Sequence, residues 1–410
     1  MRTNRWLVFA LVVLSLAFLV DLGARLFEDR RIALRTLMIL DPPPSPAVFR
    51  LDGHTFSVTG ALVRDTRPEH LTLRAWAPTP TIHVIKPGGD GQVTLRLENL
   101  PRRVHLDASG PVDEHHQGLT HTLHFAPQVT RHLAFTDAER EVTFAVLGDT
   151  GDSAIFSAAL HMAANAGADF LIHVGDLLYR DEQIANLATI LAISPLPVFV
   201  VRGNHDYRNT ARINFMHRLA PPYYSFQMGG ASFIILDNGA DYVPTFWRRS
   251  TQYQWLTDAL RVARDGPLFV AMHIPPFDPR AGPRQAPMRD KAFAQQLMRD
   301  FVAAGVDAVL TGHVHASYIW VRGGIPYVVS GEGSSSPEGL SHLAWVQVRR
   351  GKVTISHLPI WQQASYPSCC PDGERDGMQC CDHNMIAASS AAEIAVSVID
   401  KTVPVGYGWR

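Results

Sequence analysis

The pattern of hydrophobic and polar positions divides the chain into two parts with different periods. Between residues 47 and 140, short apolar runs are separated by Pro-Gly-Gly and Asn-Leu-Pro turns, and no helical period appears. The runs predict strands at Thr72–Trp76, Thr81–Ile85, Val93–Leu97 and Leu119–Phe125. A small all-β, sandwich-like N-terminal domain over residues 47–140 is therefore expected.

From residue 141 to residue 360 strands alternate with helices. Strands are predicted at Val142–Leu147, Phe170–Val174, Val198–Val201, 267–271 and 307–310. Helical spacing of apolar residues is found at 152–167, 251–264 and 289–304. This alternation indicates a mainly parallel sheet with helices on its faces. The predicted fold class is an α/β catalytic domain, with central sheets flanked by helices, which follows the smaller β domain in the sequence.

The N-terminus has the pattern of an export signal. Arg2 and Arg5 precede an apolar run from Trp6 to Val20. This run suits a signal-peptide core and is shorter than the roughly 18–20 residues that span a bilayer. Residues 1–27 are predicted to be a signal peptide or an uncleaved signal anchor, and both alternatives stay open. Residues 28–46 form a linker that ends in a stiff proline-rich segment. We expect an exported, periplasmic or extracellular protein. Attachment to the membrane through residues 1–27 is one alternative.

The four cysteines lie in the predicted C-terminal tail, residues 361–410, as Cys369, Cys370, Cys380 and Cys381. In an oxidising compartment two disulfides that close a small loop are the natural interpretation, with three possible connectivities. A zinc site that includes His383 is the alternative, although the spacing fits no common zinc pattern.

Overall charge argues against a nucleic-acid partner. The net charge is −1 and the isoelectric point is about 7.0, so no strong field surrounds the chain. Nine of the 19 histidines lie in the β-rich segment, among them His105, His115, His116, His121 and His124. They suggest either a metal-capturing surface or exposed histidines on strands and loops. The second interpretation is favoured, because no pair combines ligand spacing with a carboxylate.

Polar side chains follow five strands of the α/β part, at the point where each strand ends. Open parallel sheets place their ligands at the carboxyl ends of the strands. Each cluster alone is common turn chemistry. Together they supply the carboxylates, imidazoles and amide oxygen that metal ions need, in a number that suggests two ions sharing one carboxylate. The clusters are Gly148-Asp149-Thr150-Gly151, Gly175-Asp176-Leu177-Leu178-Tyr179, Gly203-Asn204-His205-Asp206, Met272-His273 and Gly312-His313-Val314-His315.

The order of these five motifs resembles the calcineurin-like metallophosphoesterase superfamily, over about residues 141–360. Most members carry Asp-x-His in the first motif, whereas this chain has Gly151 at the histidine position and Tyr179 three residues after Asp176. That joint change is most similar to purple acid phosphatases. The sequence departs from many of these at Ala316-Ser317-Tyr318, which follows the last histidine.

The resemblance implies two metal ions bridged by Asp176. The first would be held by Asp149, Asp176, Tyr179 and His315, and the second by Asp176, Asn204, His273 and His313. A tyrosinate favours Fe(III) at the first site, and Zn(II), Mn(II) or Fe(II) would fill the second. His205 is predicted to protonate the leaving oxygen. Asp206 is predicted to orient His205, with an exposed loop carboxylate as the alternative. His173, between apolar neighbours, is interpreted as a core residue.

These roles predict a hydrolase that cleaves small phosphate monoesters by attack of a metal-bound hydroxide. A phosphodiesterase acting on nucleotides or lipid head groups is the nearest alternative, because the same metal core serves both reactions. A non-catalytic binding protein with the same fold is the alternative from another class. The presence of every ligand position argues against it.

Overall fold

The computed structural model describes residues 46–360, except 89, 208–210, 240–250, 263, 281–284, 332 and 334–340. The predicted export signal, nearly all of the linker and the cysteine-bearing tail lie outside the described residues. Among the residues that are described, no helix has the length and apolar character needed to cross a membrane.

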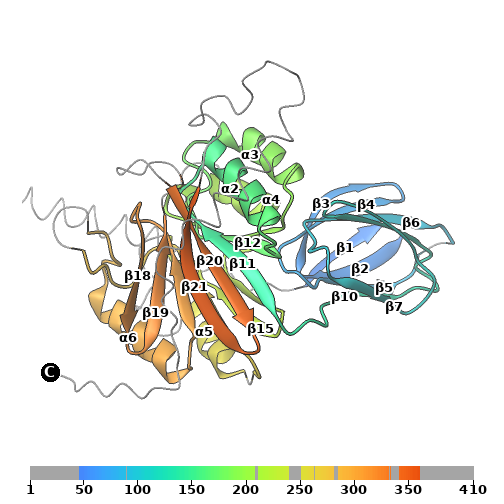
Figure 1. Ribbon diagram of the computed structural model, residues 1–410. Helices are drawn as coiled ribbons and strands as arrows, with labels where there is room; N and C mark the ends of the chain where they lie inside the picture. Colours follow the sequence, from blue (N-terminus) through green and yellow to red (C-terminus); the bar gives the residue numbers. More distant parts are fainter. Residues whose placement is uncertain are drawn as a thin grey trace, which may run out of the picture.

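The first domain is a sandwich of two five-stranded sheets, as the strand pattern predicts (Figure 1). One sheet is antiparallel throughout, in the order β1 (Ala47–Leu51), β2 (His54–Thr59), β5 (Thr81–Lys86), β10 (His132–Thr136) and β7 (His105–Ala108). The other has the order β3 (Ala61–Arg67), β4 (His70–Ala75), β6 (Val93–Glu98), β9 (Thr120–Phe125) and β8 (Asp113–Gln117), with β4 and β6 parallel. Alternate residues of both sheets, such as Phe56 and Leu73, fill one shared core.

The second domain contains two mixed sheets. The first has the order β13 (Val198–Val200), β12 (Phe170–His173), β11 (Val142–Leu147), β20 (Ser341–Arg349) and β21 (Lys352–Ile360). The second has the order β14 (Tyr224–Met228), β15 (Ala231–Ile235), β16 (Leu268–Ala271), β17 (Ala308–Thr311), β19 (Ile325–Ser330) and β18 (Ser317–Arg322). The motif-bearing strands pair in parallel, while β14, β18, β20 and β21 pair antiparallel with their neighbours. The expectation of one mainly parallel sheet is therefore wrong: the strands form two sheets, and hairpins between residues 317 and 360 extend them.

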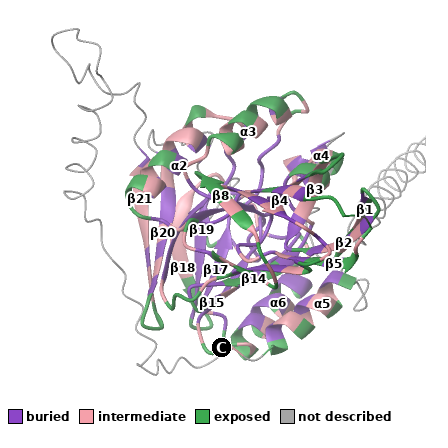
Figure 2. Cartoon of the chain, turned by 90° about the vertical axis from the view of Figure 1, so that its right-hand side faces the viewer, coloured by how far each residue is buried: buried purple, intermediate pink, exposed green. Residues whose placement is uncertain are grey.

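Helices cover the outer faces of the two sheets, which confirms the predicted fold class. The core of the first sheet includes residues of α2 (Ala154–Asn165) and α3 (Gln183–Ala192), and α4 (Ala211–Arg218) lies on the same side (Figure 1). The core of the second sheet includes residues of α5 (Thr251–Arg261) and α6 (Lys291–Ala303). Figure 2 shows the buried strands between helices whose outer faces are exposed.

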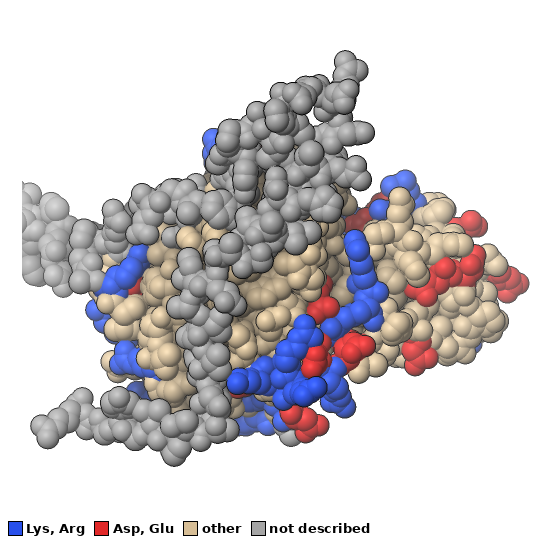
Figure 3. All heavy atoms as spheres, in the orientation of Figure 1, with Lys and Arg blue, Asp and Glu red and all other residues tan. Residues whose placement is uncertain are grey.

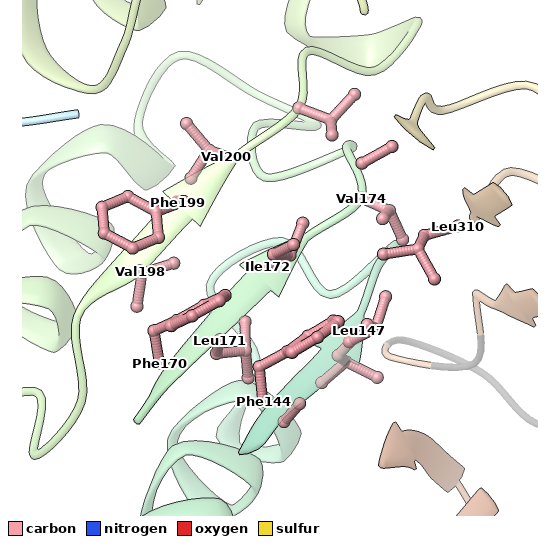
Figure 4. Packing of buried hydrophobic residues seen from close by; sticks show 14 of the residues in the cluster. Phe144, Leu147, Phe170, Leu171, Ile172, Val174, Val198, Phe199, Val200 and Leu310 are labelled. Carbon is pink, nitrogen blue, oxygen red and sulfur yellow. The ribbon is translucent and has the colours of Figure 1, made fainter. Parts of the chain in front are cut away.

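Aromatic packing joins the two sheets of the second domain. Every residue of β11 is buried, as expected for a continuous apolar run with both faces covered. Phe144 of β11 stacks on Phe170 with ring centroids 5.2 Å apart (Figure 4). It also meets Phe233 and Phe269 of the other sheet edge-on, each at 5.2 Å. The position of the strand ends of both sheets therefore depends on this cluster.

A set of buried contacts fixes the first domain against the second. Asn99 donates from Nδ2 to the carbonyl oxygens of Ala75 and Val198, at 2.8 and 3.1 Å, and accepts from Val198 N–H at 2.9 Å. Trp76 packs edge-on against Tyr224, with ring centroids 5.1 Å apart. The β sandwich is thus attached to the catalytic domain beside β13.

Replacement of Phe144 by alanine tests the role of the aromatic cluster. We expect Phe144→Ala to lower the free energy of unfolding by about 3–5 kcal/mol, because it leaves a cavity between the sheets. Chemical denaturation followed by tryptophan fluorescence measures the change. Val302→Ala, at a position 48% exposed on α6, is the control and should stay within about 0.5 kcal/mol of the parent. Equal losses in the two variants would contradict the proposed role.

Candidate metal centre

The five predicted clusters meet where the parallel strands end. Asp149 follows β11, Asp176 follows β12, and Asn204 follows β13 in the first sheet. His273 follows β16, and His313 follows β17 in the second. The two buried carboxylates and His273 each place a ligand atom within 4.8 Å of the others. The boundary between the two sheets therefore brings together residues that are far apart in the sequence: Asp149 and His273 are separated by 124 positions.

Asp176 lies at the centre of the cluster. Its Oδ1 is 3.4 Å from Nε2 of His273 and accepts the backbone N–H of His205 at 2.8 Å. Its Oδ2 is 3.8 Å from Nε2 of His205. A carboxylate whose two oxygens face histidine nitrogens that follow strands of different sheets is suited to bridge two cations.

Three of the predicted donors, Asn204, His273 and His313, form one contact group. Oδ1 of Asn204 lies 2.9 Å from Nε2 of His273 and 2.8 Å from Nδ1 of His313. The other ring nitrogen of His273, Nδ1, is 2.7 Å from the carbonyl oxygen of Val174. A proton on Nδ1 donates to that carbonyl and leaves Nε2 as the lone-pair donor that faces the cluster.

Asp149 and His315 form a second contact, and Tyr179 lies beside His205. Asp149 is fully buried; its Oδ2 accepts the backbone N–H of His313 at 2.8 Å. Its Oδ1 is buried without a hydrogen-bond partner in the described part of the chain, and Nε2 of His315 lies 3.5 Å from it. The ring of Tyr179 packs on that of His205, with centroids 4.4 Å apart. An orphaned buried carboxylate oxygen is what an absent cation leaves behind.

The backbone at the ligand positions is held in a conformation that L-residues rarely adopt. Asp149, Asp176, His313 and His315 have φ values of 59°, 60°, 68° and 46°. They are half of the eight described non-glycine residues with positive φ. Left-handed backbone at such residues costs about 1–3 kcal/mol each and persists where the surroundings over-determine it, which is a frequent property of functional sites.

The exchange of histidine for glycine in the first motif has a steric basis. Gly151 has φ +53°, and a Cβ atom there would lie 3.0 Å from Cδ2 of Tyr179 and 3.0 Å from Nε2 of Gln183. The Tyr179 ring therefore occupies the space into which a side chain at position 151 would extend. The position of the Tyr179 ring therefore depends on the absence of a side chain at Gly151.

The charge balance of the cluster calls for a cation. Burial raises the pKa of Asp149 well above its usual range, and the Asp176 charge adds to this. Burial opposes the charge on Asp176 too, but His273 and His205 outweigh it and hold the pKa of that carboxyl below its ordinary value. Against its own burial, Asp176 and Asp149 raise the pKa of His273 to about 9. The two carboxylates thus favour positive charge between them, and a bound cation would supply it.

The residues fit two metal ions. Burial, together with the neighbouring His273, lowers the pKa of His313 to about 3. The pKa of His315 is lowered as well, chiefly by burial. Neutral imidazoles, ionised carboxylates and an amide oxygen are the ligand forms that divalent and trivalent ions require.

Comparison with known proteins finds relatives of the second domain. Residues 142–317 match the model of the family described as calcineurin-like phosphoesterase. Purple acid phosphatase 18 of Arabidopsis thaliana is 31% identical over 211 residues, which are 45% of this chain and 46% of that protein. The Bos taurus serine/threonine-protein phosphatase CPPED1 is 29% identical over 172 residues, 37% of this chain and 54% of that protein. The chain spans about half the length of these curated relatives.

The chain carries a calcineurin-like phosphoesterase domain. The predicted superfamily and the resemblance to purple acid phosphatases are thereby confirmed. Among solved structures, the purple acid phosphatase PPD1 from yellow lupin aligns with a TM-score of 0.47 at 13% identity, covering 74% of this chain and 72% of that one. The prediction of a metallophosphoesterase is supported by the family match, and the roles of the individual ligands stay predictions.

Asp206 of the phosphoesterase domain does not lie where the sequence suggested. It is fully buried, so the alternative of an exposed loop carboxylate is wrong. Its Oδ2 accepts the N–H groups of Gly203 and Asp176 at 2.7 and 3.0 Å, and its Oδ1 accepts that of Leu178 at 2.8 Å. Burial and the Asp176 charge raise its pKa to about 7. Asp206 is a positioning residue that holds the Asp176 and Asn204 loops together, in place of the predicted contact with His205.

Two further positioning residues of the domain escaped the sequence analysis. Oε1 of Gln183 accepts the N–H groups of Tyr179 and Arg180, at 2.7 and 2.9 Å, and so fixes the loop that carries the tyrosine. Oδ1 of Asn238 accepts the N–H groups of His273 and Ile274, at 2.9 and 3.1 Å. Asn238 follows the apolar run of β15 and so carries the same sequence signal as the predicted ligands, a polar residue after a buried strand. Gln183 has no comparable sequence signal.

A core histidine and a histidine cluster lie outside the metal centre. His173 is fully buried, with Nε2 2.8 Å from Oγ1 of Thr150 and its ring edge-on to Phe156, in agreement with a core position. In the β sandwich, Glu114, His116 and His121 place ligand atoms within 4.8 Å of one another. The statement that no histidine pair there has a carboxylate partner is therefore wrong. Strand pairing sets His116 opposite His121, with Glu114 on the same face of β8.

The packing of Gly151 against Tyr179 leads to a prediction with a matched control. We expect Gly151→Ala and Gly167→Ala each to cost about 1–3 kcal/mol, because both positions have positive φ. The space around Gly167 is open, whereas Gly151 faces Tyr179. Gly151→Ala should therefore also lower the metal content of the purified protein, measured by mass spectrometry of the metals. Equal metal content in the two variants would refute the steric coupling to Tyr179.

Proposed function

We propose that this protein hydrolyses phosphate monoesters of small molecules at the dinuclear centre. The observation that carries the proposal is the convergence of Asn204, His273 and His313 within hydrogen-bond distance, beside the buried carboxylates Asp149 and Asp176. The relatives with purple acid phosphatase and protein phosphatase names support the monoester over the diester. A centre of this kind in a merely binding protein would not need so complete a donor set.

The residues divide between two ions as the resemblance implies. Asp149, Asp176, Tyr179 and His315 would hold the first, and Asp176, Asn204, His273 and His313 the second. A hard phenolate donor favours Fe(III) at the first site, with Zn(II), Mn(II) or Fe(II) at the second. When bound, such a pair supplies an activated water near neutral pH and neutralises charge on the phosphoryl group.

His205 supplies the proton chemistry in this proposal. Its side chain is 22% exposed, while its backbone N–H is fixed to Asp176, so the ring is held at the edge of the cluster next to solvent. The ring packs on Tyr179, which limits its orientations. A histidine held in this way can give a proton to the leaving oxygen of a substrate bound at the metals.

We also propose that the reaction takes place outside the cytoplasm. The support is the apolar run from Trp6 to Val20, which two arginines precede, together with the four cysteines of the C-terminal tail. Membrane attachment through the same run stays an alternative to cleavage. Both features lie outside the described residues.

The substrate class is tested with p-nitrophenyl phosphate and bis-p-nitrophenyl phosphate. The full chain is loaded with iron plus zinc or manganese, and initial rates are compared at equal concentrations. We expect the kcat/KM for the monoester to exceed that for the diester by at least about tenfold, which is about 1.4 kcal/mol of transition-state discrimination. Preference for the diester would replace the proposal by a phosphodiesterase. Absence of both activities under every metal loading would support the binding-protein alternative.

The role of Tyr179 is tested by colour as well as by rate. A phenolate on Fe(III) gives a charge-transfer absorption in the visible range, so the iron-loaded protein should be coloured. Tyr179→Phe should abolish that band while preserving the ring packing on His205. Tyr318→Phe, a hydroxyl removal on β18, is the matched control and should leave the band in place. A band that persists in Tyr179→Phe would show that another residue supplies the anionic donor.

A further inference from the structure

A cavity rich in arginine lies between the β sandwich and the phosphoesterase domain. Its volume is about 510 Å³, within the range of small-molecule sites. β3, β4 and β6 form one wall, and α3 with the end of α4 forms the other. Figure 1 shows α4 close to the β3 and β4 side of the sandwich. The metal centre uses none of the residues that line this cavity.

Arg74 is the feature that structural needs do not explain. It lies on β4 between Leu73 and Ala75, which face the sandwich core, so its side chain emerges on the opposite face of the sheet. That face is covered by the second domain, and Arg74 is 5% exposed. Its Nε and Nη2 are buried without a hydrogen-bond partner in the described part of the chain. A buried guanidinium in this state is costly unless an anion compensates it.

The surroundings of Arg74 add positive charge. Five arginines and one acidic residue, Glu98, line the cavity; the arginines are Arg64, Arg74, Arg96, Arg102 and Arg218. Glu98 accepts a hydrogen bond from Arg96 at 3.1 Å. Burial and the neighbouring charge of Arg64 together lower the pKa of Arg74 to about 10, against the opposing effect of Glu98. On the face shown in Figure 3, by contrast, basic side chains lie interleaved with acidic ones.

One arginine of the cavity has a structural task, which sharpens the case for the others. Arg64 is the extra residue of a β-bulge, since Val63 pairs with Leu73 and Asp65 with Thr72. Its Nη1 donates to the carbonyl oxygen of Arg218 at the end of α4, at 2.7 Å. Arg64 thereby joins the two domains. The same explanation does not extend to Arg74.

The helical wall of the cavity is apolar. Ile184, Leu187, Ala188 and Leu191 all line it from α3, at the spacing of a single helix face. A ligand that fills the cavity would therefore meet guanidinium groups on the sheet side and aliphatic side chains on the helix side. Guanidinium groups bind phosphate-type anions through paired N–H donors.

We propose that this cavity binds a small organic anion with a phosphate-type group and an apolar part, with Arg74 as its central anion contact. The anionic group lies against Arg74 and the rim arginines, and the apolar part lies against α3. The site is separate from the metal centre and does not depend on the hydrolytic activity of the protein.

Phenylphosphonate, which carries such a group on a stable carbon–phosphorus bond, is the probe. Isothermal titration calorimetry of the metal-loaded full chain at constant ionic strength counts the molecules bound and measures their affinity. We expect Arg74→Met to bind one fewer phenylphosphonate per chain than the parent, while binding at the metal centre is retained. Arg67→Gln, an exposed arginine on the same sheet, is the matched control and should bind as the parent does.

Thermal unfolding separates a binding role from a structural one. Without anions, Arg74→Met should melt at a higher temperature than the parent, because it removes a buried charge that Glu98, its neighbour on β6, compensates only in part. Phenylphosphonate should raise the melting temperature of the parent more than sodium chloride of equal ionic strength does, and this extra rise should shrink in Arg74→Met. A structural role predicts the reverse: a lower melting temperature for Arg74→Met without anions.

A second variant keeps the proposal testable if Arg74→Met does not fold. Arg218→Gln alters an exposed rim arginine and should weaken phenylphosphonate binding at the cavity on the order of tenfold, the effect of one lost charge-assisted hydrogen bond. Unchanged stoichiometry and affinity in both cavity variants, relative to Arg67→Gln, would overturn the proposal.

Discussion

Two carboxylates buried side by side are the constraint on which the rest of the structure depends. Asp149 and Asp176 lie at the seam between two sheets, out of contact with bulk water. Like charges at this depth repel each other strongly, and water cannot screen them. A positive charge between them resolves the conflict. His273 places a ligand atom within 4.8 Å of both carboxylates, and Oδ1 of Asp149 is buried without a hydrogen-bond partner in the described part of the chain.

The fold meets this constraint through rigid supports for each ligand. Phe144 and its aromatic neighbours fix the distance between the sheets, and therefore between Asp176 on one sheet and His273 on the other. Asp206 joins the backbones of two ligand loops, and Asn238 holds the backbone of His273. Left-handed backbone at four ligand positions shows that these supports outweigh local preference. A site that is preorganised in this way loses little conformational entropy when it binds metal.

The junction of the two domains poses the same electrostatic problem with the opposite sign. Arg74 is buried beside other arginines, as Asp149 is buried beside Asp176. α3 connects the two places: its first residue, Gln183, holds the Tyr179 loop, and its apolar face lines the arginine cavity. The β sandwich therefore does more than support the catalytic domain, because it supplies four of the five arginines of that cavity.

The sequence by itself indicated the buried strands of the α/β part and the candidate ligand positions at their ends, while the tertiary structure decided which segments pair and which side chains meet. Continuous apolar runs such as Val142–Leu147 predict buried strands, and the polar residues at their ends identify Asp149, Asp176, Asn204, His273 and His313, because both signals are local. The division into two sheets could not be read from the chain, since it depends on strands that pair across long separations, such as β11 with β20. The same reason applies to Asp206, whose neighbours suggested His205 but whose hydrogen bonds run to Asp176 and Leu178, about thirty residues away. Arg74 and the Glu114–His116–His121 cluster belong to this class too, because burial and cross-strand contact arise only when distant segments meet.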